Sequence, residues 1–167
     1  VAIIGVETLY GKHTGKHPVF DSLVTLGFGE TRSKFFRSEL EHFLLLCLEE
    51  GLDPATLHGS YAGAMGLGQF ISSSYRHYSV DADNDGKRDL WTSPEDIIYS
   101  VANYFKKHGW RSQQGITYQI ERSDNGTEID TSNALKPAFS VAALKAQGFD
   151  IKSHEEGPVS LIVLDQK

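Results

Sequence analysis

One acidic loop constrains this sequence more than any other feature. Residues 81–86 read DADNDG, with aspartate at alternate positions and glycine sixth. This is the first half of an EF-hand loop, where oxygens at positions 1, 3 and 5 converge on Ca²⁺ and glycine allows a sharp turn. Because three carboxylates this close repel one another without a cation, the pattern favours a calcium loop over a solvated acidic turn. The candidate ligands are the side chains of Asp81, Asp83 and Asp85 and the backbone carbonyl of Lys87, at position 7.

The far end of this loop departs from the EF-hand pattern. Position 12 holds Thr92, where a bidentate Glu is expected. The next acids are Glu95 and Asp96, so a longer loop that closes on the following helix would take its last ligand from one of them. Ser93-Pro94 begins that helix as an N-cap followed by Pro at the first helical position.

The rest of the first 110 residues has helical periodicity. The longest amphipathic pattern runs over 31–50 and ends at Gly51, a natural helix stop. Its apolar stripe comprises Phe35, Phe36, Leu40, Phe43, Leu44 and Cys47. Other apolar or helical segments are expected at 1–10, 18–28, about 69–78 and 93–108.

Residues 111–167 show strand-like patterns in addition to a helical one. The segments 116–121 and 159–165 resemble strands, 124–126 reads as a turn, and 137–148 predicts a short helix. We therefore expect a helical region over 1–110, containing the calcium loop 81–96, followed by a small and incomplete α+β lobe over 111–167. Val1 begins a helical pattern without a cap and the last residues resemble a strand, so both ends read as cuts within a larger protein.

Composition excludes several classes of protein. The net charge of −6 argues against a nucleic-acid groove, which needs a basic face. A single cysteine excludes a disulfide framework and a cysteine-rich zinc site. No apolar run approaches the roughly 20 residues of a membrane-spanning helix.

Two further features could carry chemistry. Glu7 is a lone carboxylate in an apolar helix, and a buried carboxylic acid retains its proton at neutral pH, as a general acid must. Taken alone, Glu7 is better explained by an exposed position on an amphipathic helix or by a buried structural ion pair. The glycine-rich segment 59–70 is neither a phosphate loop nor a Rossmann motif, and tight packing is its simplest explanation. Ser60 and Gln69 flank this segment and could hydrogen-bond a substrate.

Taken together, these motifs resemble those of one enzyme family. IIGVETLYG (3–11), GSYAGAMGLGQFISSSY (59–75), the acidic loop and SVANYFKKHGW (100–110) follow one another as in the membrane-bound lytic murein transglycosylase B family, which includes soluble periplasmic forms. The resemblance spans nearly the whole chain. It implies a mainly α, lysozyme-like catalytic core with a small α+β lobe and an EF-hand-like loop.

The resemblance also implies residue roles. The catalytic Glu corresponds to Glu7, and the substrate-binding residues correspond to Ser60, Gln69 and Tyr104. The last calcium ligand of the family precedes an apolar helix start, which favours Asp96, although the loop before it is one residue longer here. The implied Ca²⁺ is structural, and no organic cofactor is expected.

The implied activity is cleavage, without water, of the β-1,4 bond between N-acetylmuramic acid and N-acetylglucosamine in peptidoglycan. The product would carry a 1,6-anhydromuramic end. Because Glu7 is the only carboxylate in a credible site, the substrate's acetamido group would supply the nucleophile. The alternatives are a muramidase that uses water and a non-catalytic, calcium-stabilised glycan-binding module.

The resemblance places the protein in the periplasm, with a soluble or an outer-membrane lipid-anchored full-length form. Its partners would be peptidoglycan glycan strands and other cell-wall enzymes in complexes, and not nucleic acid. We expect a monomer.

Overall fold

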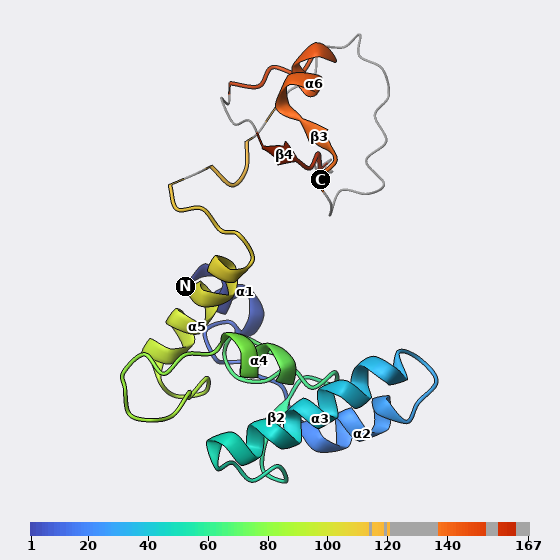
Figure 1. The fold of residues 1–167 in the computed structure, drawn as a ribbon, viewed down its shortest axis with the longest axis vertical. Helices are drawn as coiled ribbons and strands as arrows, with labels where there is room; N and C mark the ends of the chain where they lie inside the picture. Colours follow the sequence, from blue (N-terminus) through green and yellow to red (C-terminus); the bar gives the residue numbers. More distant parts are fainter. Residues whose placement is uncertain (114, 119, 121–136, 153–156, 163–167) are drawn as a thin grey trace. The chain divides into compact units, whose positions relative to one another are not determined.

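A computed structural model describes residues 1–113, 115–118, 120, 137–152 and 157–162. The chain divides into two compact units, Val1–Arg111 and Ser112–Lys167. In the first unit the elements are α1 (Ala2–Thr8), β1 (His17–Pro18), α2 (Val19–Gly27), α3 (Ser33–Glu50), β2 (His58–Gly59), α4 (Ser72–Tyr78) and α5 (Pro94–Lys107) (Figure 1). In the second they are β3 (Phe139–Ser140), α6 (Val141–Ala146) and β4 (Pro158–Val159).

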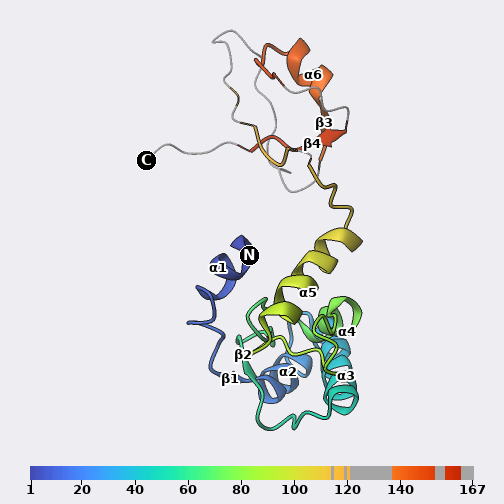
Figure 2. The ribbon, with the colours of Figure 1, turned by 90° about the vertical axis from the view of Figure 1, so that its left-hand side faces the viewer.

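Helix α3 is the centre of the first unit. Helices α2 and α4 both pack on it, and α5 packs on α4 (Figures 1 and 2). Strands β1 and β2 pair antiparallel, with His17 opposite Gly59 and Pro18 opposite His58. The fully or nearly fully buried core includes Val19, Leu23, Phe43, Leu46, Met65, Tyr75, Leu90 and Ile97.

The buried face of α3 differs slightly from the expected stripe. Phe36, Phe43 and Cys47 are buried as expected, but Leu44 is 45% exposed and Leu46 is fully buried. Residues 43–48 are all apolar, so periodicity alone leaves the orientation of the helix open, and the positions of α2 and α4 decide it. Gly51 ends the helix with a φ of +65°, which confirms the predicted stop.

Helix α4 begins later than the sequence indicates. Gln69 has a φ of +48° and Phe70 pairs with Met65 in an isolated bridge, so the helix begins at Ser72. Its N-cap residue, Ile71, has no side-chain cap. Instead the buried carboxylate of Glu39, on α3, accepts hydrogen bonds from the Ser73 backbone N–H (2.9 Å) and the Ser73 hydroxyl (2.7 Å). A residue 34 positions away thus caps α4.

The predicted start of α5 is confirmed. The Ser93 side chain accepts from the Asp96 N–H, and Pro94 is the first helical residue. The helix ends at Lys107, and Gly109 follows with a φ of +88°.

The described residues of the second unit form less strand than the sequence patterns predict. Strands β3 and β4 pair antiparallel. The buried core of this unit comprises Val141 and Leu144, both on α6, and Ile151. Residues 116–118 and 120 form no strand. Of residues 159–162, the described part of the predicted strand at 159–165, only Val159 lies in β4. The predicted turn at 124–126 lies outside the described residues. Among the described residues, no helix combines the length and the apolar character needed to cross a membrane.

Candidate active site

Glu7 is exposed, so of the interpretations that the sequence leaves open the exposed position holds and burial does not. It lies near the end of α1, a two-turn helix in which only Ile4 and Thr8 are buried. Val6 is 82% exposed even though it is apolar. The apolar pattern of 1–10 predicts burial on several faces, whereas the first unit covers only one face of this short helix.

Thr8, next to Glu7, fixes α1 to the glycine-rich segment. Its hydroxyl lies 3.0 Å from the carbonyl oxygen of Leu67 and 3.1 Å from that of Ile4, and it accepts from the Gly11 N–H (3.1 Å). No motif in the sequence indicates this role of Thr8. The only signal available was a polar side chain on the same helix face as Ile4.

Ser60 is held by the turn that follows it. Its Oγ accepts from the backbone N–H groups of Ala64 (3.0 Å) and Ala62 (3.3 Å), and its own N–H donates to Ala64 O. The hydroxyl proton has no acceptor among the described residues. This side chain can therefore donate a hydrogen bond to a ligand.

Gln69 joins the glycine-rich segment to the chain that leads away from α1. Its side-chain amide donates to Thr14 O (3.1 Å) and Gly66 O (2.9 Å). With both amide hydrogens used, the Oε1 atom remains as an acceptor for a ligand.

Tyr104, on α5, belongs to an aromatic cluster that also includes rings from α4 and from the glycine-rich segment. Its ring stacks on His108 at 4.1 Å between centroids and lies 5.2 Å from Tyr78 and 6.0 Å from Phe70. Phe70 pairs with Met65, which in turn pairs with Gly59, so the same framework supports Ser60, Gln69 and Tyr104. Among the described residues, no hydrogen bond joins these three side chains to one another or to Glu7.

The acidic loop brings three carboxylates together. One oxygen each from Asp81, Asp83 and Asp96 lies within 4.8 Å of the others. Since Ca²⁺ takes oxygen ligands at about 2.3–2.6 Å, oxygens at these separations fit around one cation. Asp85 is outside this group and its carboxylate accepts from the Lys87 N–H (2.8 Å).

Asp96 also closes the loop. It is fully buried, and its two oxygens accept from the N–H groups of Ala82 and Asp89, each at 2.7 Å. Glu95, the alternative ligand, is exposed. Burial opposes the charged form of Asp89, but hydrogen bonds from Thr92 and the Trp91 N–H outweigh it and lower the pKa of Asp89.

An ion-pair network that the sequence does not predict anchors this loop to α3. Arg88 donates from Nε (2.6 Å) and from its backbone N–H (3.1 Å) to the carboxylate of Glu50. Arg76 on α4 donates to Glu49 at 2.6 Å, and this hydrogen bond lowers the pKa of Glu49. Tyr75 donates to Arg88 O, and burial raises the pKa of Tyr75. No spacing in the sequence links residues 49–50 to 88.

Three comparisons bear on this geometry. A family model described as the Transglycosylase SLT domain matches residues 1–167. The membrane-bound lytic murein transglycosylase B of Escherichia coli (strain K12) is 44% identical over 170 residues, which cover 99% of this chain and 45% of the relative.

Solved structures agree with the sequence comparisons. The lytic transglycosylase Slt35 of Escherichia coli, in complex with calcium, is 42% identical, with a TM-score of 0.85 over 96% of this chain and 51% of its own. SltB3 of Pseudomonas aeruginosa, in complex with NAG-anhNAM-pentapeptide, is 34% identical, with a TM-score of 0.77 over 95% of this chain and 41% of its own. The chain thus spans about half the length of the relatives it matches.

The fold is therefore mainly helical and lysozyme-like, as predicted. The chain belongs to the Transglycosylase SLT domain family. Its resemblance to membrane-bound lytic murein transglycosylase B, predicted from four motifs, is confirmed over nearly its whole length.

Proposed function

We propose that this chain is part of a lytic murein transglycosylase that cleaves the β-1,4 bond between N-acetylmuramic acid and N-acetylglucosamine in peptidoglycan. The observation that carries the proposal is the match to this family over the whole chain, with 44% identity to a lytic murein transglycosylase. The protein would act in the periplasm, where murein lies, and its full-length form would be soluble or lipid-anchored.

Glu7 acts as general acid and then as general base. As Glu7 protonates the oxygen of the leaving N-acetylglucosamine, the acetamido oxygen of the muramic acid attacks its own anomeric carbon. Glu7, now a carboxylate, then takes the proton from the 6-hydroxyl of the same sugar. That oxygen displaces the acetamido group and closes the 1,6-anhydro ring, so no water is consumed. Because Glu7 is exposed, a bound glycan can reach its carboxyl group.

Ser60, Gln69 and Tyr104 bind and orient the sugar. The free hydroxyl proton of Ser60 can donate to the acetamido oxygen, and Oε1 of Gln69 can accept from a sugar hydroxyl. The Tyr104 hydroxyl forms no hydrogen bond among the described residues, which supports a role in positioning Glu7 once the glycan is bound.

Ca²⁺ would be held by Asp81, Asp83 and Asp96, with Asp85 and the carbonyl of Lys87 completing the set. The convergence of the first three carboxylates and the calcium complex of Slt35 support this site. The ion would tie the loop to α5 and would take no part in the reaction.

A non-catalytic glycan-binding module is the alternative that one observation favours, since such a module has no need of a buried acid and Glu7 is exposed. The test is digestion of purified murein sacculi by the full-length protein, with Glu7→Gln compared with Glu30→Gln, an exposed glutamate outside the site. We expect Glu7→Gln to abolish cleavage and Glu30→Gln to retain it.

Mass spectrometry of the products then identifies the reaction. An anhydromuramic end is one water molecule lighter than a reducing end, which a muramidase would produce. Full activity of Glu7→Gln would refute its role, and absence of turnover by the parent protein would favour the binding module.

A further inference from the structure

We propose that a contact between Gly5 and Tyr10 positions the carboxyl group of Glu7 for the reaction. The ring of Tyr10 folds back onto α1 and covers Gly5. A Cβ atom at Gly5 would lie 2.8 Å from Cζ and 2.9 Å from the hydroxyl oxygen of Tyr10. The inference rests on the proposed function, since Tyr10 has this role only if Glu7 is the catalytic acid.

Gly5 is an unfavourable residue for its place in the chain. It lies inside α1, where glycine is less stable than alanine because it loses more conformational freedom on folding. Its φ is not in the left-handed region, so the backbone alone does not require glycine there. The atoms that would crowd a Cβ at this position belong to the ring and the hydroxyl of Tyr10. The contact with Tyr10 therefore accounts for the glycine.

The chain that brings Tyr10 back onto α1 is strained. Leu9 and Tyr10 have φ values of +50° and +56°, in the left-handed region that disfavours residues with a side chain. A left-handed residue at the end of a helix is usually glycine. Two consecutive residues of this kind persist only where the surrounding contacts enforce them, and such strain clusters at functional sites.

Backbone hydrogen bonds and the Tyr10 ring together enforce this turn. The N–H groups of Leu9 and Tyr10 donate to Gly5 O (3.0 Å) and Ile4 O (3.2 Å). These bonds close the last turn of α1, which carries Glu7. The helix has seven residues, of which only two are buried, so it has little other packing to hold that turn. The Gly5–Tyr10 contact thus fixes the backbone from which the Glu7 side chain projects.

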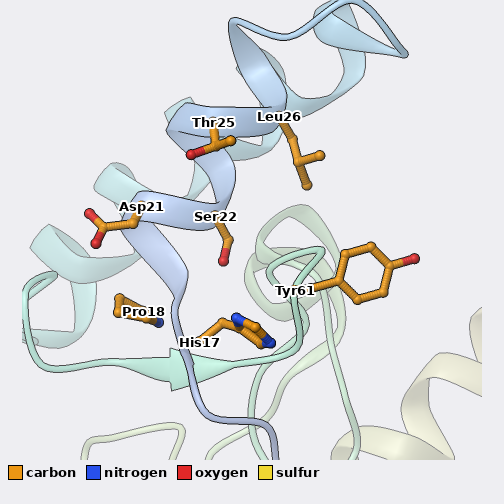
Figure 3. A pocket seen from close by; sticks show the side chains of 7 residues that line it. All are labelled: His17, Pro18, Asp21, Ser22, Thr25, Leu26 and Tyr61. Atoms are coloured by element: carbon orange, nitrogen blue, oxygen red, sulfur yellow. The ribbon is translucent and has the colours of Figure 1, made fainter.

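Tyr10 differs from Tyr61, another exposed tyrosine. Tyr61 is 72% exposed, and its ring lines a pocket with His17 and Leu26 (Figure 3). Tyr10 is 63% exposed, but its ring lies against its own helix. A ring that touches a ligand acts through binding and changes KM, whereas a ring packed on α1 acts through the position of Glu7 and changes kcat.

The test uses variants of the full-length protein that remove the Gly5–Tyr10 contact from either side. Tyr10→Ala removes the ring, Tyr10→Phe keeps it, and Gly5→Ala displaces it by adding a Cβ atom. Tyr99→Ala is the matched control, because Tyr99 is 62% exposed and lies on α5. Initial rates on soluble peptidoglycan fragments give kcat and KM, and amide hydrogen exchange reports on the last turn of α1.

We expect Tyr10→Ala and Gly5→Ala to lower kcat about tenfold, with KM changed less than about twofold. The amide hydrogens of residues 9 and 10 should exchange faster in both variants, and Tyr10→Phe should resemble the parent protein in both readouts. Gly5→Ala is the sharper variant, because alanine favours the helix and its Tm should be unchanged or higher even though kcat falls. A residue that only stabilised the fold would not produce this combination.

Unchanged kcat in Tyr10→Ala or in Gly5→Ala would overturn the proposal. A higher KM at constant kcat would also overturn it, because Tyr10 would then contact the glycan. So would an equal loss of kcat in Tyr99→Ala, or a loss without faster exchange at residues 9 and 10. An inactive parent protein or an active Glu7→Gln would instead refute the proposed function, and unchanged exchange in Gly5→Ala would still refute the contact separately.

Discussion

At the scale of single residues, the position of Glu7 depends on Thr8. The buried Thr8 hydroxyl lies between the carbonyl of Leu67 and the N–H of Gly11, and this contact holds the end of α1 against the glycine-rich segment. Thr8 thereby also places the carboxylate of the preceding residue, Glu7, which forms no hydrogen bond or ion pair among the described residues.

Replacing Thr8 by Val should keep the shape of this side chain and remove its hydrogen bonds. We expect a loss of about 1–2 kcal/mol in the free energy of unfolding, because the carbonyl of Leu67 and the N–H of Gly11 lose a partner. Activity on sacculi should fall further than stability explains, since α1 is no longer fixed. Denaturant unfolding and initial rates measure the two effects, with exposed Thr31→Val as the control. Unchanged stability would show that the hydroxyl is dispensable.

At the scale of elements, α3 does more than form the core. The buried Glu39 caps α4, and Glu49 and Glu50 hold Arg76 and Arg88. The acidic loop therefore depends on a helix that ends about 30 residues before it.

Glu39→Gln tests the cap on α4. Gln retains one acceptor oxygen, but its amide hydrogens would face the N–H or hydroxyl of Ser73. We expect a loss of about 1–3 kcal/mol in unfolding free energy, measured by urea titration. Glu41→Gln, on the exposed side of the same helix, should change stability by less than about 0.5 kcal/mol. Equal effects of the two variants would argue against the cap.

The acidic loop offers a test of the proposed Ca²⁺ site by comparing two adjacent residues, Glu95 and Asp96. Adding Ca²⁺ at a hundredfold excess over its Kd should stabilise the parent protein by about 2.7 kcal/mol, seen as a rise in Tm that a chelator reverses. Asp96→Asn should lose most of this shift and Glu95→Gln should retain it, since only Asp96 lies in the carboxylate group. If Glu95→Gln lost the shift in Tm and Asp96→Asn retained it, Glu95 would be the last ligand instead.

The sequence predicts the helices better than it predicts the contacts between distant elements. The caps of α3 and α5 are local patterns, so Gly51 and Ser93 could be identified directly. The start of α4 could not, because Glu39 supplies its cap from another helix. The same limit applies to the site: motifs identified Glu7 and Ser60 as candidates, but the exposure of Glu7 and the role of Thr8 depend on how α1 meets the glycine-rich segment.

At the scale of the whole molecule, the charge of −6 is unevenly distributed. Asp81, Asp83, Asp85, Asp89 and Asp96 lie within one stretch of sixteen residues. A bound Ca²⁺ would offset two of these charges, and the arginines at 76 and 88 lie beside the glutamates at the end of α3.

This arrangement predicts a pH dependence. The hydrogen bond from Arg76 lowers the pKa of Glu49 in the folded protein. The stability that this ion pair contributes is therefore complete at pH values above the pKa of Glu in the unfolded chain, about 4.3. That contribution is lost as the pH falls through the lower folded-state pKa. The difference in Tm between the parent protein and Glu49→Gln should be small at pH 7 and should vanish near pH 3. A difference that persists in acid would show that the ion pair is not its source.

The close approach of β1 and β2 has a consequence for how this sequence can vary. Gly15 lies on the surface, yet a Cβ atom there would stand 2.0 Å from the backbone oxygen of Gly59, and its φ of +94° disfavours any other residue. Backbone cannot move aside as a side chain can. In a library of all single substitutions, this exposed position should therefore tolerate fewer replacements than the buried Leu46, where another apolar side chain can be accommodated. Solvent exposure would then be a poor guide to which residues of this fold tolerate substitution.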